Sequence, residues 1–234
     1  MDGVAQEISI GTDTIGTGIS ISTGISISTE TIGAAWLEVA RRILSDGVAS
    51  SYDGLPILEL PRVTLTVEHP GTADEIIDRF GDPERLAWMH ANFTDHSLVR
   101  ELGDARSYAS RLFRYGATSR NQIDWVVDRL TADPTSRSAT ITTFEPLLDT
   151  AYIPCVSLLD FWIRDGALEQ VVYAHSIDFG AKGYGNLVEL AWLQEHVAAR
   201  LGLPVGRLDF IVKSAHIYST EFDFMDEILA RNGA

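Results

Sequence analysis

The residues best suited to chemistry are a single cysteine and the polar side chains that follow it in the chain. Cys155 is preceded by Pro154 and begins an apolar run that extends to Ile163. The downstream polar set is His175-Ser176-Ile177-Asp178, Gly185-Asn186 and His216-Ile217-Tyr218. A thiolate attacks soft carbon atoms, while carboxylate, amide and imidazole groups can hold a polar small molecule against it. The pattern indicates a cysteine nucleophile that faces a small-molecule pocket.

These residues also have simpler interpretations. An isolated cysteine in a strand-like segment is often an inert, buried small hydrophobe. Asn186 can cap a helix, and His216 and Tyr218 can be ordinary sheet residues. A cysteine hydrolase with a Cys155–His216 dyad is a further alternative, but no oxyanion-hole motif accompanies the thiol. The ordered set as a whole favours a shared site.

Composition limits the class of protein. The chain has 234 residues, 45% of them hydrophobic, which is enough for one domain with a full core. The net charge of -15 argues against sequence-independent nucleic-acid binding, which needs a basic surface. The six histidines are scattered, so no metal site is expected. With one cysteine, no internal disulfide and no apolar stretch of about 18 residues, we expect a cytoplasmic protein that does not bind membranes.

The first 33 residues differ from the rest of the chain. Segment 1–33 is rich in Gly, Ser, Thr and Ile, and the hexapeptide Gly-Ile-Ser-Ile-Ser-Thr occurs at 18–23 and again at 24–29. The alternation has strand periodicity, yet there are few large side chains to bury. We expect a low-complexity tail or an edge strand pair over 1–33, with the catalytic domain over 34–234.

Hydrophobic spacing predicts helices interleaved with strands in the catalytic domain. Asp165-Gly166 is a typical hairpin turn between two strands. The predicted helices are 34–45, 72–80, 83–92, 122–130, 187–201 and 221–230, and the predicted strands are 57–67, 139–144, 155–163, 167–175 and 208–217. A mixed sheet flanked by helices follows, so the fold class is α/β or α+β.

At this level of detail the chain resembles thymidylate synthase, a family that includes the dCMP and CMP hydroxymethylases. The resemblance covers about residues 104–218 and is closest to the compact archaeal members. The motifs that carry it are Asn121-Gln122-Ile123-Asp124, Asp133-Pro134-Thr135-Ser136-Arg137, Ile153-Pro154-Cys155, His175-Ser176-Ile177-Asp178, Gly185-Asn186 and His216-Ile217-Tyr218. It implies the thymidylate synthase fold and a homodimer that packs sheet against sheet.

The resemblance also implies a reaction and a role for each residue. Cys155 adds to C6 of a pyrimidine nucleotide, and C5 then takes a one-carbon unit from 5,10-methylenetetrahydrofolate, which serves as co-substrate. Reduction gives a methyl group and attack by water gives a hydroxymethyl group. The implied assignments are Ser176 on the phosphate, Asn186 on the base, His216 and Tyr218 on the sugar, Asp178 and Trp88 on the folate, Tyr108 in moving the C5 proton, and Glu75 as general base.

The phosphate end departs from the family pattern. The family has an arginine directly before the Ser-x-Asp motif, where this chain has His175. The family also donates two adjacent arginines across the dimer interface, and this chain has Arg137 followed by Ser138. His175 can assist the thiolate only when it is protonated, and it can instead be a neutral strand residue. A protein that binds a nucleotide or nucleoside without one-carbon chemistry therefore remains an alternative. The sequence also leaves open whether the base is uracil or cytosine, whether the sugar is ribose or deoxyribose, and whether the product carries a methyl or a hydroxymethyl group.

Overall fold

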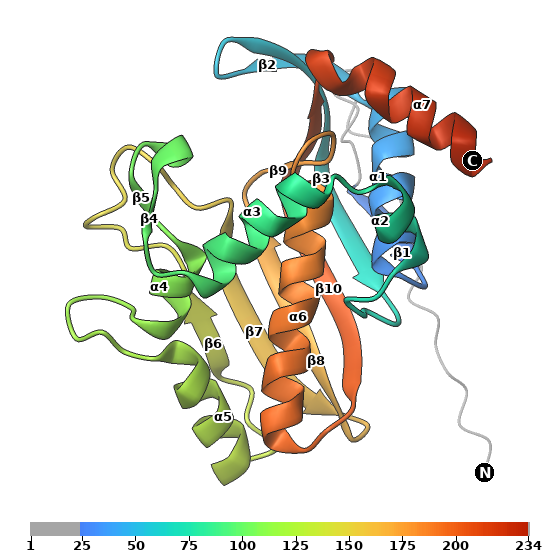
Figure 1. The fold of residues 1–234 in the computed structure, drawn as a ribbon. Coiled ribbons are helices and arrows are strands. Elements are labelled where there is room, and N and C mark those ends of the chain that lie inside the picture. The colour runs from blue at the N-terminus through green and yellow to red at the C-terminus, as the bar shows by residue number, and fades with distance from the viewer. Residues whose placement is uncertain (1–23, 234) are drawn as a thin grey trace, which may run out of the picture.

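The computed structural model describes residues 24–233, which form an eight-stranded mixed sheet, a separate two-stranded sheet and helices that flank the larger sheet (Figure 1). The strands are β1 (Ile25–Thr29), β2 (Val48–Tyr52), β3 (Leu55–Val67), β4 (Leu98–Val99), β5 (Ala105–Arg106), β6 (Ala139–Thr142), β7 (Val156–Arg164), β8 (Ala167–Ala174), β9 (Ile177–Asp178) and β10 (Val205–Tyr218). The helices are α1 (Ile32–Asp46), α2 (Glu75–Phe80), α3 (Pro83–Thr94), α4 (Tyr108–Phe113), α5 (Gln122–Ala132), α6 (Gly183–Leu201) and α7 (Phe222–Asn232). The mixed α/β class predicted from the sequence is confirmed.

The sheet order is β1-β3-β10-β8-β7-β6, with β2 also paired to β3 and β9 also paired to β10. The central strand β10 runs antiparallel to β3 and parallel to β8. The predicted hairpin is confirmed, since β7 and β8 are antiparallel and Asp165 and Gly166 both have positive φ. This topology brings the start of β7, the short β9 and the end of β10 close to one another.

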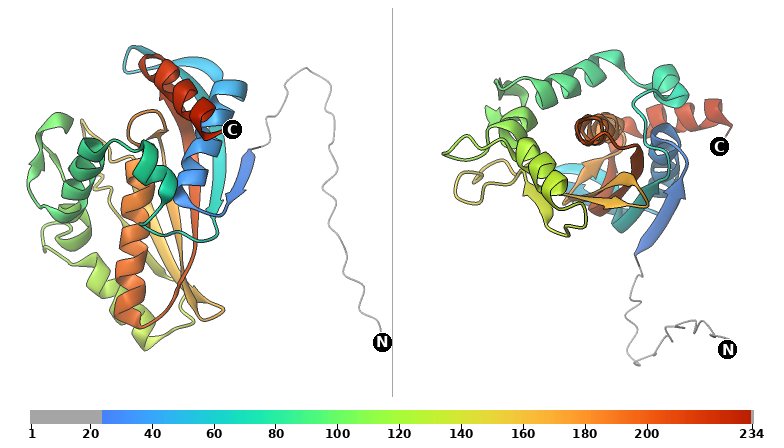
Figure 2. Two further views of the ribbon diagram at one scale, coloured as in Figure 1. Left: turned by 45° about the vertical axis from the view of Figure 1, so that its right-hand side comes forward. Right: turned by 90° about the horizontal axis from the view of Figure 1, so that it is seen from below.

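The large helices cover one face of the sheet. α6 crosses the middle of that face, with α5 on one side and α1 on the other (Figures 1 and 2). Trp36 on α1 is fully buried, and its indole N–H donates to the Phe179 carbonyl at 2.8 Å. The Trp36 ring also lies 4.5 Å from that of Tyr184, at the start of α6. Burial of a side chain this large contributes about 3 kcal/mol, and here it fixes the loop between β9 and α6.

Several boundaries differ from the predicted ones. Residues 24–33, expected in the N-terminal segment, form β1 and the start of α1, and β1 pairs in parallel with β3 at the sheet edge. Ile27 and Ile32 are buried there. The rest of segment 1–33, including the first copy of the hexapeptide at 18–23, lies outside the described residues. α6 starts at Gly183 rather than 187, because packing of Tyr184 outweighs the helix-breaking tendency of the two glycines.

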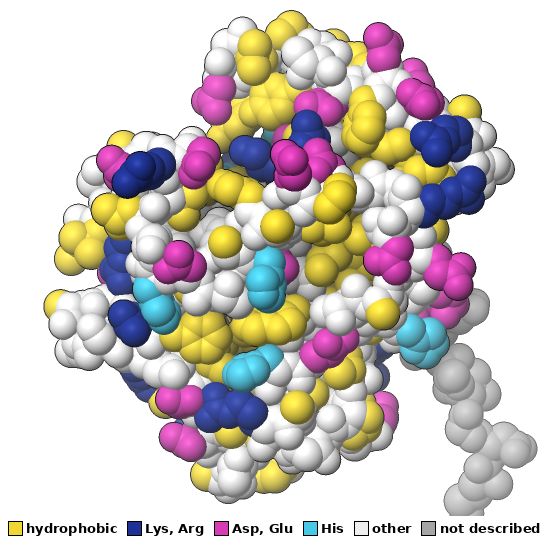
Figure 3. All heavy atoms as spheres, viewed as in Figure 1, with side chains coloured by type: hydrophobic (Ala, Val, Ile, Leu, Met, Phe, Trp, Pro, Cys, Tyr) yellow, Lys and Arg dark blue, Asp and Glu magenta, His cyan; other side chains and the backbone are white. Residues whose placement is uncertain are grey.

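Two surface properties bear on function. In residues 24–233, none of the helices has the length and apolar character that a membrane span requires. On the face that carries α3 and α6, basic and acidic side chains are interspersed (Figure 3).

Candidate active site

Cys155 lies between Pro154 and the first residue of β7 and is partly exposed to a cavity of about 180 Å³. Most of the predicted site residues meet at this cavity. Its lining consists of Tyr52, Asp53, Trp88, Met89, Asn92, Leu102, Tyr108, Tyr152, Cys155, Ser176, Asp178, Lys182, Asn186, His216 and Tyr218. Residues far apart in the sequence therefore share one small site with the thiol.

Different elements deliver these side chains. Asp178 ends β9, which pairs with β10 through Asp178 and His216, and Tyr218 ends β10 two residues later. Alternation along a strand places His216 and Tyr218 on the same side. Asn186 is buried in the first turn of α6, where its side chain donates to the Lys182 carbonyl at 3.4 Å. Strand ends thus supply one wall of the cavity and a helix start supplies another.

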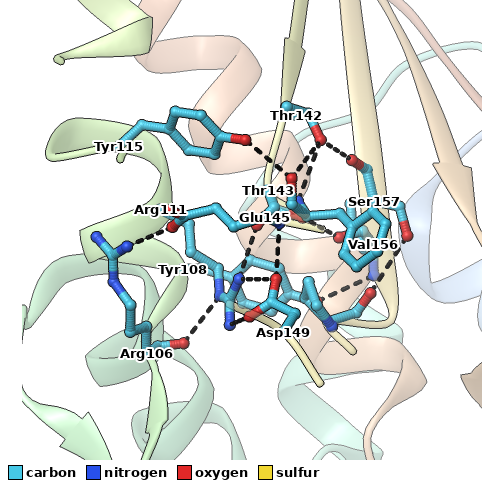
Figure 4. A network of polar contacts seen from close by, with 12 residues as sticks. Arg106, Tyr108, Arg111, Tyr115, Thr142, Thr143, Glu145, Asp149, Val156 and Ser157 are labelled. Atoms are coloured by element: carbon cyan, nitrogen blue, oxygen red, sulfur yellow. Dashed lines mark hydrogen bonds and ion pairs between the residues drawn. The ribbon is translucent and has the colours of Figure 1, made fainter. Parts of the chain in front are cut away.

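A buried ion pair anchors the segment that carries Cys155 (Figure 4). Arg111 on α4 is 2% exposed and pairs with both carboxylate oxygens of Asp149, at 2.7 and 2.8 Å. The same guanidinium donates to the Thr143 carbonyl at 2.8 Å, and the Thr143 hydroxyl donates to the Val156 carbonyl. These contacts hold chain on both sides of the cysteine to α4.

Tyr108 is the second anchor of the segment. Its hydroxyl oxygen accepts a hydrogen bond from the Val156 N–H at 3.0 Å, next to the thiol. Burial raises the pKa of Tyr108 well above its usual range. The phenol is consequently neutral near pH 7, with its proton available toward the cavity.

The Cys155 thiol experiences opposing influences. Burial raises its pKa, while the positive charge of Lys182 opposes that rise and the charge of Asp178 adds to it. The Tyr152 hydroxyl bonds to the thiol and also favours the thiolate. Burial raises the pKa of Tyr152 too, so this hydroxyl keeps its proton and acts as a donor.

Asp178 and His216 are paired strand residues that both line the cavity. Asp178 accepts hydrogen bonds from the N–H groups of Gly180 and Ala181 at 3.0 and 3.3 Å. Burial raises the Asp178 pKa and lowers the His216 pKa. His216 Nδ1 lies 3.4 Å from the Ser176 hydroxyl, whereas its buried Nε2 has no partner among the described residues. A buried ring nitrogen of this kind is suited to a polar ligand group.

Three predicted site residues lie elsewhere. Glu75 is exposed at the start of α2, which Asp74 caps, and its side chain does not line the cavity. Arg137 is exposed and lines another cavity, beside Trp162. His175 follows β8, and its ring lies 3.4 Å from the Ser157 hydroxyl rather than in the Cys155 cavity. The backbone N–H of His175 donates to the Cys155 carbonyl at 3.0 Å, but the side chains of Glu75 and His175 do not line the thiol cavity.

His175 provides a stability prediction. Burial, followed by the nearby charge of Lys213, lowers its pKa, so the folded protein binds a proton here less readily than the unfolded chain. Stability therefore falls as the pH drops from 6.5 through the lowered pKa. We expect His175→Gln to reduce the loss of Tm between pH 7.5 and 5.5 by about 1–2 °C, measured by scanning calorimetry.

The matched control is His69→Gln, because the His69 side chain is 79% exposed. That variant should follow the wild-type curve. His196 and His216 have pKa values lowered mainly by burial, so part of the acid loss should remain in His175→Gln. A curve for His175→Gln identical to the wild type would contradict the prediction.

A larger cavity of about 400 Å³ adjoins the Cys155 cavity and shares Trp88, Met89 and Lys182 with it. The rest of its wall consists of Asp82, Glu84, Arg85, Glu101, Ala181, Tyr184 and Gly185. The aromatic and thioether side chains of this wall suit a flat heteroaromatic ring system, and its charged side chains, two basic and three acidic, can bind polar groups at the rim of such a ring. The residues present therefore fit a folate-like co-substrate beside the thiol site. Among residues 24–233, no group of three or more His, Cys, Asp or Glu side chains is arranged to hold a metal ion.

Sequence reasoning missed seven residues of the thiol cavity, namely Tyr52, Asp53, Met89, Asn92, Leu102, Tyr152 and Lys182. Tyr52 ends β2, and its ring stacks on Tyr218 at 6.5 Å. Asp53-Gly54 has the positive φ values of a hairpin turn, and this dipeptide was a usable signal for the β2–β3 hairpin. Tyr152 and Lys182 stand in no recognisable pattern.

Comparison with known proteins identifies the family to which the chain is similar. A family model described as thymidylate synthase matches residues 74–234. A protein from Methanosarcina acetivorans named "Putative thymidylate synthase" is 32% identical over 215 residues, which is 88% of this chain and 95% of that protein. A protein of the same name from Methanothermobacter thermautotrophicus is 31% identical over 214 residues, 85% of this chain and 95% of its own length. A third, from Methanococcoides burtonii, is 30% identical over 215 residues, 88% of this chain and 95% of its own.

Proposed function

The chain belongs to the thymidylate synthase family, and we propose that it transfers a one-carbon unit to C5 of a pyrimidine nucleotide, with Cys155 as the nucleophile. The observation that supports this most is the convergence of Cys155, Ser176, Asn186, His216 and Tyr218 on one small cavity. A thiol alone is weak evidence for this function, because an isolated cysteine is often an inert buried side chain. A thiol beside an amide and a histidine–tyrosine pair matches a ring with a polar edge and a hydroxylated sugar.

The proposed reaction begins with addition of the thiolate. A bond forms between Cys155 Sγ and C6 of the ring, and the C5–C6 π electrons move toward O4 to give an enolate whose C5 is nucleophilic. C5 forms a bond to the one-carbon unit of the co-substrate and loses its proton, and the bond between that carbon and the co-substrate nitrogen breaks. Hydride or water then adds to the resulting methylene carbon, and its electron pair gives the enolate again. Return of electrons from C5 to C6 expels the thiolate and restores the double bond. Tyr108, with its hydroxyl beside the Cys155 segment, is the proposed carrier of the C5 proton.

Recognition of the nucleotide is divided among three parts of the site. Asn186 can donate to and accept from the N3–O4 edge of uracil. His216 and Tyr218 are placed to bind the sugar, with the unpartnered His216 Nε2 as one available group. Ser176 is the proposed hydroxyl donor to the phosphate.

Asn186→Asp tests the base assignment. A carboxylate only accepts hydrogen bonds, so it suits the amino group of cytosine and repels O4 of uracil. We expect the ratio of kcat/KM for uracil over cytosine nucleotides to fall about 100-fold. Asn92→Asp, at another amide that lines the cavity, is the matched control. An unchanged base ratio in Asn186→Asp would remove Asn186 from base recognition.

5,10-Methylenetetrahydrofolate is the proposed co-substrate and occupies the larger cavity. When bound, it supplies a one-carbon unit at the oxidation level of formaldehyde. Trp88 is the residue proposed to stack on it, since this ring borders both cavities, and Asp178 faces it from the thiol side. Whether hydride or water adds to the methylene carbon on C5 decides between a methyl and a hydroxymethyl product.

A homodimer is expected through the face of the sheet opposite α6. Leu158, Tyr173 and Ile211 pair across β7, β8 and β10 and are 38%, 37% and 47% exposed. An apolar row of this kind is typical of a protein interface. Arg137 lines a cavity together with Trp162, which lies on β7 of the same sheet. This position supports the proposed role of Arg137 in the site of a partner copy.

A nucleotide- or nucleoside-binding protein without one-carbon chemistry is the second candidate. One observation favours it: among the described residues that line the Cys155 cavity, none is an arginine, and His175 lies outside. A phosphate dianion would then depend on Ser176 and on residues from a partner copy.

The experiment that separates these functions is release of tritium from C5 of UMP, dUMP, CMP and dCMP in the presence of methylenetetrahydrofolate. Release from one nucleotide establishes one-carbon chemistry, and the product mass distinguishes methyl from hydroxymethyl. Nucleotide binding by a folded dimer without release from any of the four would favour the binding protein and overturn the proposal.

A further inference from the structure

Lys182 is the one lysine or arginine among the described residues that line the Cys155 cavity, where Asp53 and Asp178 supply the carboxylates. It also lines the larger cavity, and its ammonium group lies 5.7 Å from the centre of the Trp88 ring. The chain contains only two lysines, Lys182 and Lys213. A cation at the boundary between two ligand cavities is positioned to act on charge that develops in either one.

The residue expected to provide positive charge does not lie in the cavity. The His175 ring is directed to Ser157, and burial lowers its pKa, so it is largely neutral near pH 7. A thiolate in a partly buried site needs a nearby cation to offset the cost of desolvation. Lys182 is the group in the described chain that meets this need.

We propose that Lys182 is a positioning residue that keeps Cys155 available as a thiolate, in place of His175. The inference rests on the proposed role of Cys155 as nucleophile. Because Lys182 is exposed in the cavity mouth, solvent screens its charge and the effect is moderate. The other titratable or charged groups around the thiol and its neighbours are Tyr52, Asp53, Tyr108, Arg111, Tyr152, Asp178, His216 and Tyr218.

The backbone of Lys182 has a structural role that substitution preserves. Its N–H donates to the Asp178 carbonyl at 3.2 Å, and its carbonyl accepts from the Asn186 N–H at 3.1 Å. A side-chain change leaves these bonds in place. Lys182→Gln therefore removes the charge while it keeps the loop that carries Asp178 and Asn186.

The test is alkylation of the thiol, which needs neither nucleotide nor folate. Because Cys155 is the only cysteine, the mass of the intact protein reports its reaction with iodoacetamide directly. At pH 8 and low salt we expect Lys182→Gln to react about three- to five-fold more slowly than wild type, with the pH midpoint moved upward. Lys182→Arg should restore the rate to within about two-fold, since it restores the charge.

Two further readouts exclude a merely structural effect. Negatively charged iodoacetate should lose more rate than neutral iodoacetamide in Lys182→Gln, whereas a collapsed cavity would slow both equally. Raising the salt concentration should slow alkylation of the wild-type protein but not of Lys182→Gln. Lys213→Gln, at the other lysine, is the matched control and should follow wild type.

A folded Lys182→Gln with an unchanged pH profile and an unchanged iodoacetate-to-iodoacetamide ratio would overturn the inference. That result is distinct from failure of the proposed function, which would appear as absent tritium release in a protein whose thiol still titrates as described.

Discussion

Replacing Cys155 by alanine is expected to reduce turnover at least about 10⁴-fold, the largest effect of any single substitution in this chain. Without the sulfur there is no group to add to C6, and C5 of an intact pyrimidine ring is a poor nucleophile. The side chain is small and partly exposed, so the fold should survive the change. Tritium release, together with a thermal melt, measures the two effects separately.

The alanine variant also makes a prediction about binding. Asn186, His216 and Tyr218 are untouched, so nucleotide affinity should stay within a few-fold of wild type by titration calorimetry. Cys155→Ser is the closer control, because a serine hydroxyl fits the same space but ionises far less readily than a thiol. Turnover by Cys155→Ala above about 1% of wild type would show that the sulfur is not the nucleophile.

Asp149→Ala is expected to cost about 3–5 kcal/mol of unfolding free energy, the largest stability loss that the described contacts predict. Arg111 is 2% exposed and relies on Asp149 for both ends of its guanidinium fork. Removal of Asp149 leaves a buried cation without its counter-ion. The 143–156 segment is held to α4 through the same arginine, so activity should fall as well. Urea denaturation measures the change in unfolding free energy, and the Tm of a thermal melt gives a second measure of stability.

Two comparisons isolate the cause. Asp46→Ala breaks the exposed Arg42–Asp46 pair, in which the two side chains are 41% and 46% exposed, and should cost under about 0.5 kcal/mol. The double variant Arg111→Met/Asp149→Leu removes both charges and should recover part of the loss. A cost below about 1 kcal/mol for Asp149→Ala would mean that Arg111 finds water or another partner.

The long elements of the fold were predictable from the sequence because their hydrophobic patterns are strong and their ends carry clear signals. α1 ends before Gly47, and α6 ends at Gly202 in the left-handed conformation. The β7–β8 turn was visible in Asp165-Gly166. In each of these elements, the conformation that the local sequence favours is the same as the one that tertiary packing requires.

Two short elements, α4 and β2, were not predictable from hydrophobic patterns. α4 has six residues and depends on the Ser107 cap and on burial of Arg111. β2 is exposed along its whole length, so no hydrophobic alternation marks it. Such elements form because their neighbours hold them in place, and this information is absent from a local window of sequence.

The candidate site divides in a similar way. Resemblance to the family's motifs identified eight of the fifteen residues that line the cavity, Cys155 included, since a shared ligand requires these groups in one place. Lys182 was missed because its proposed effect on the Cys155 thiolate depends on where the chain at the start of α6 places the lysine ammonium group. The role proposed for Arg137 requires a second copy of the chain, and sequence order carries no distances between copies.

The most direct test of the central role of Cys155 is a mass measurement on a trapped complex. A 5-fluoro analogue of the nucleotide that releases tritium is incubated with methylenetetrahydrofolate and the protein. Fluorine cannot leave C5 as a proton does, so the C6–sulfur bond should persist. We predict that the intact protein gains the mass of both molecules and that peptide mapping places the adduct on Cys155. A protein that binds the analogue but shows no adduct, or one bonded elsewhere, would contradict the account.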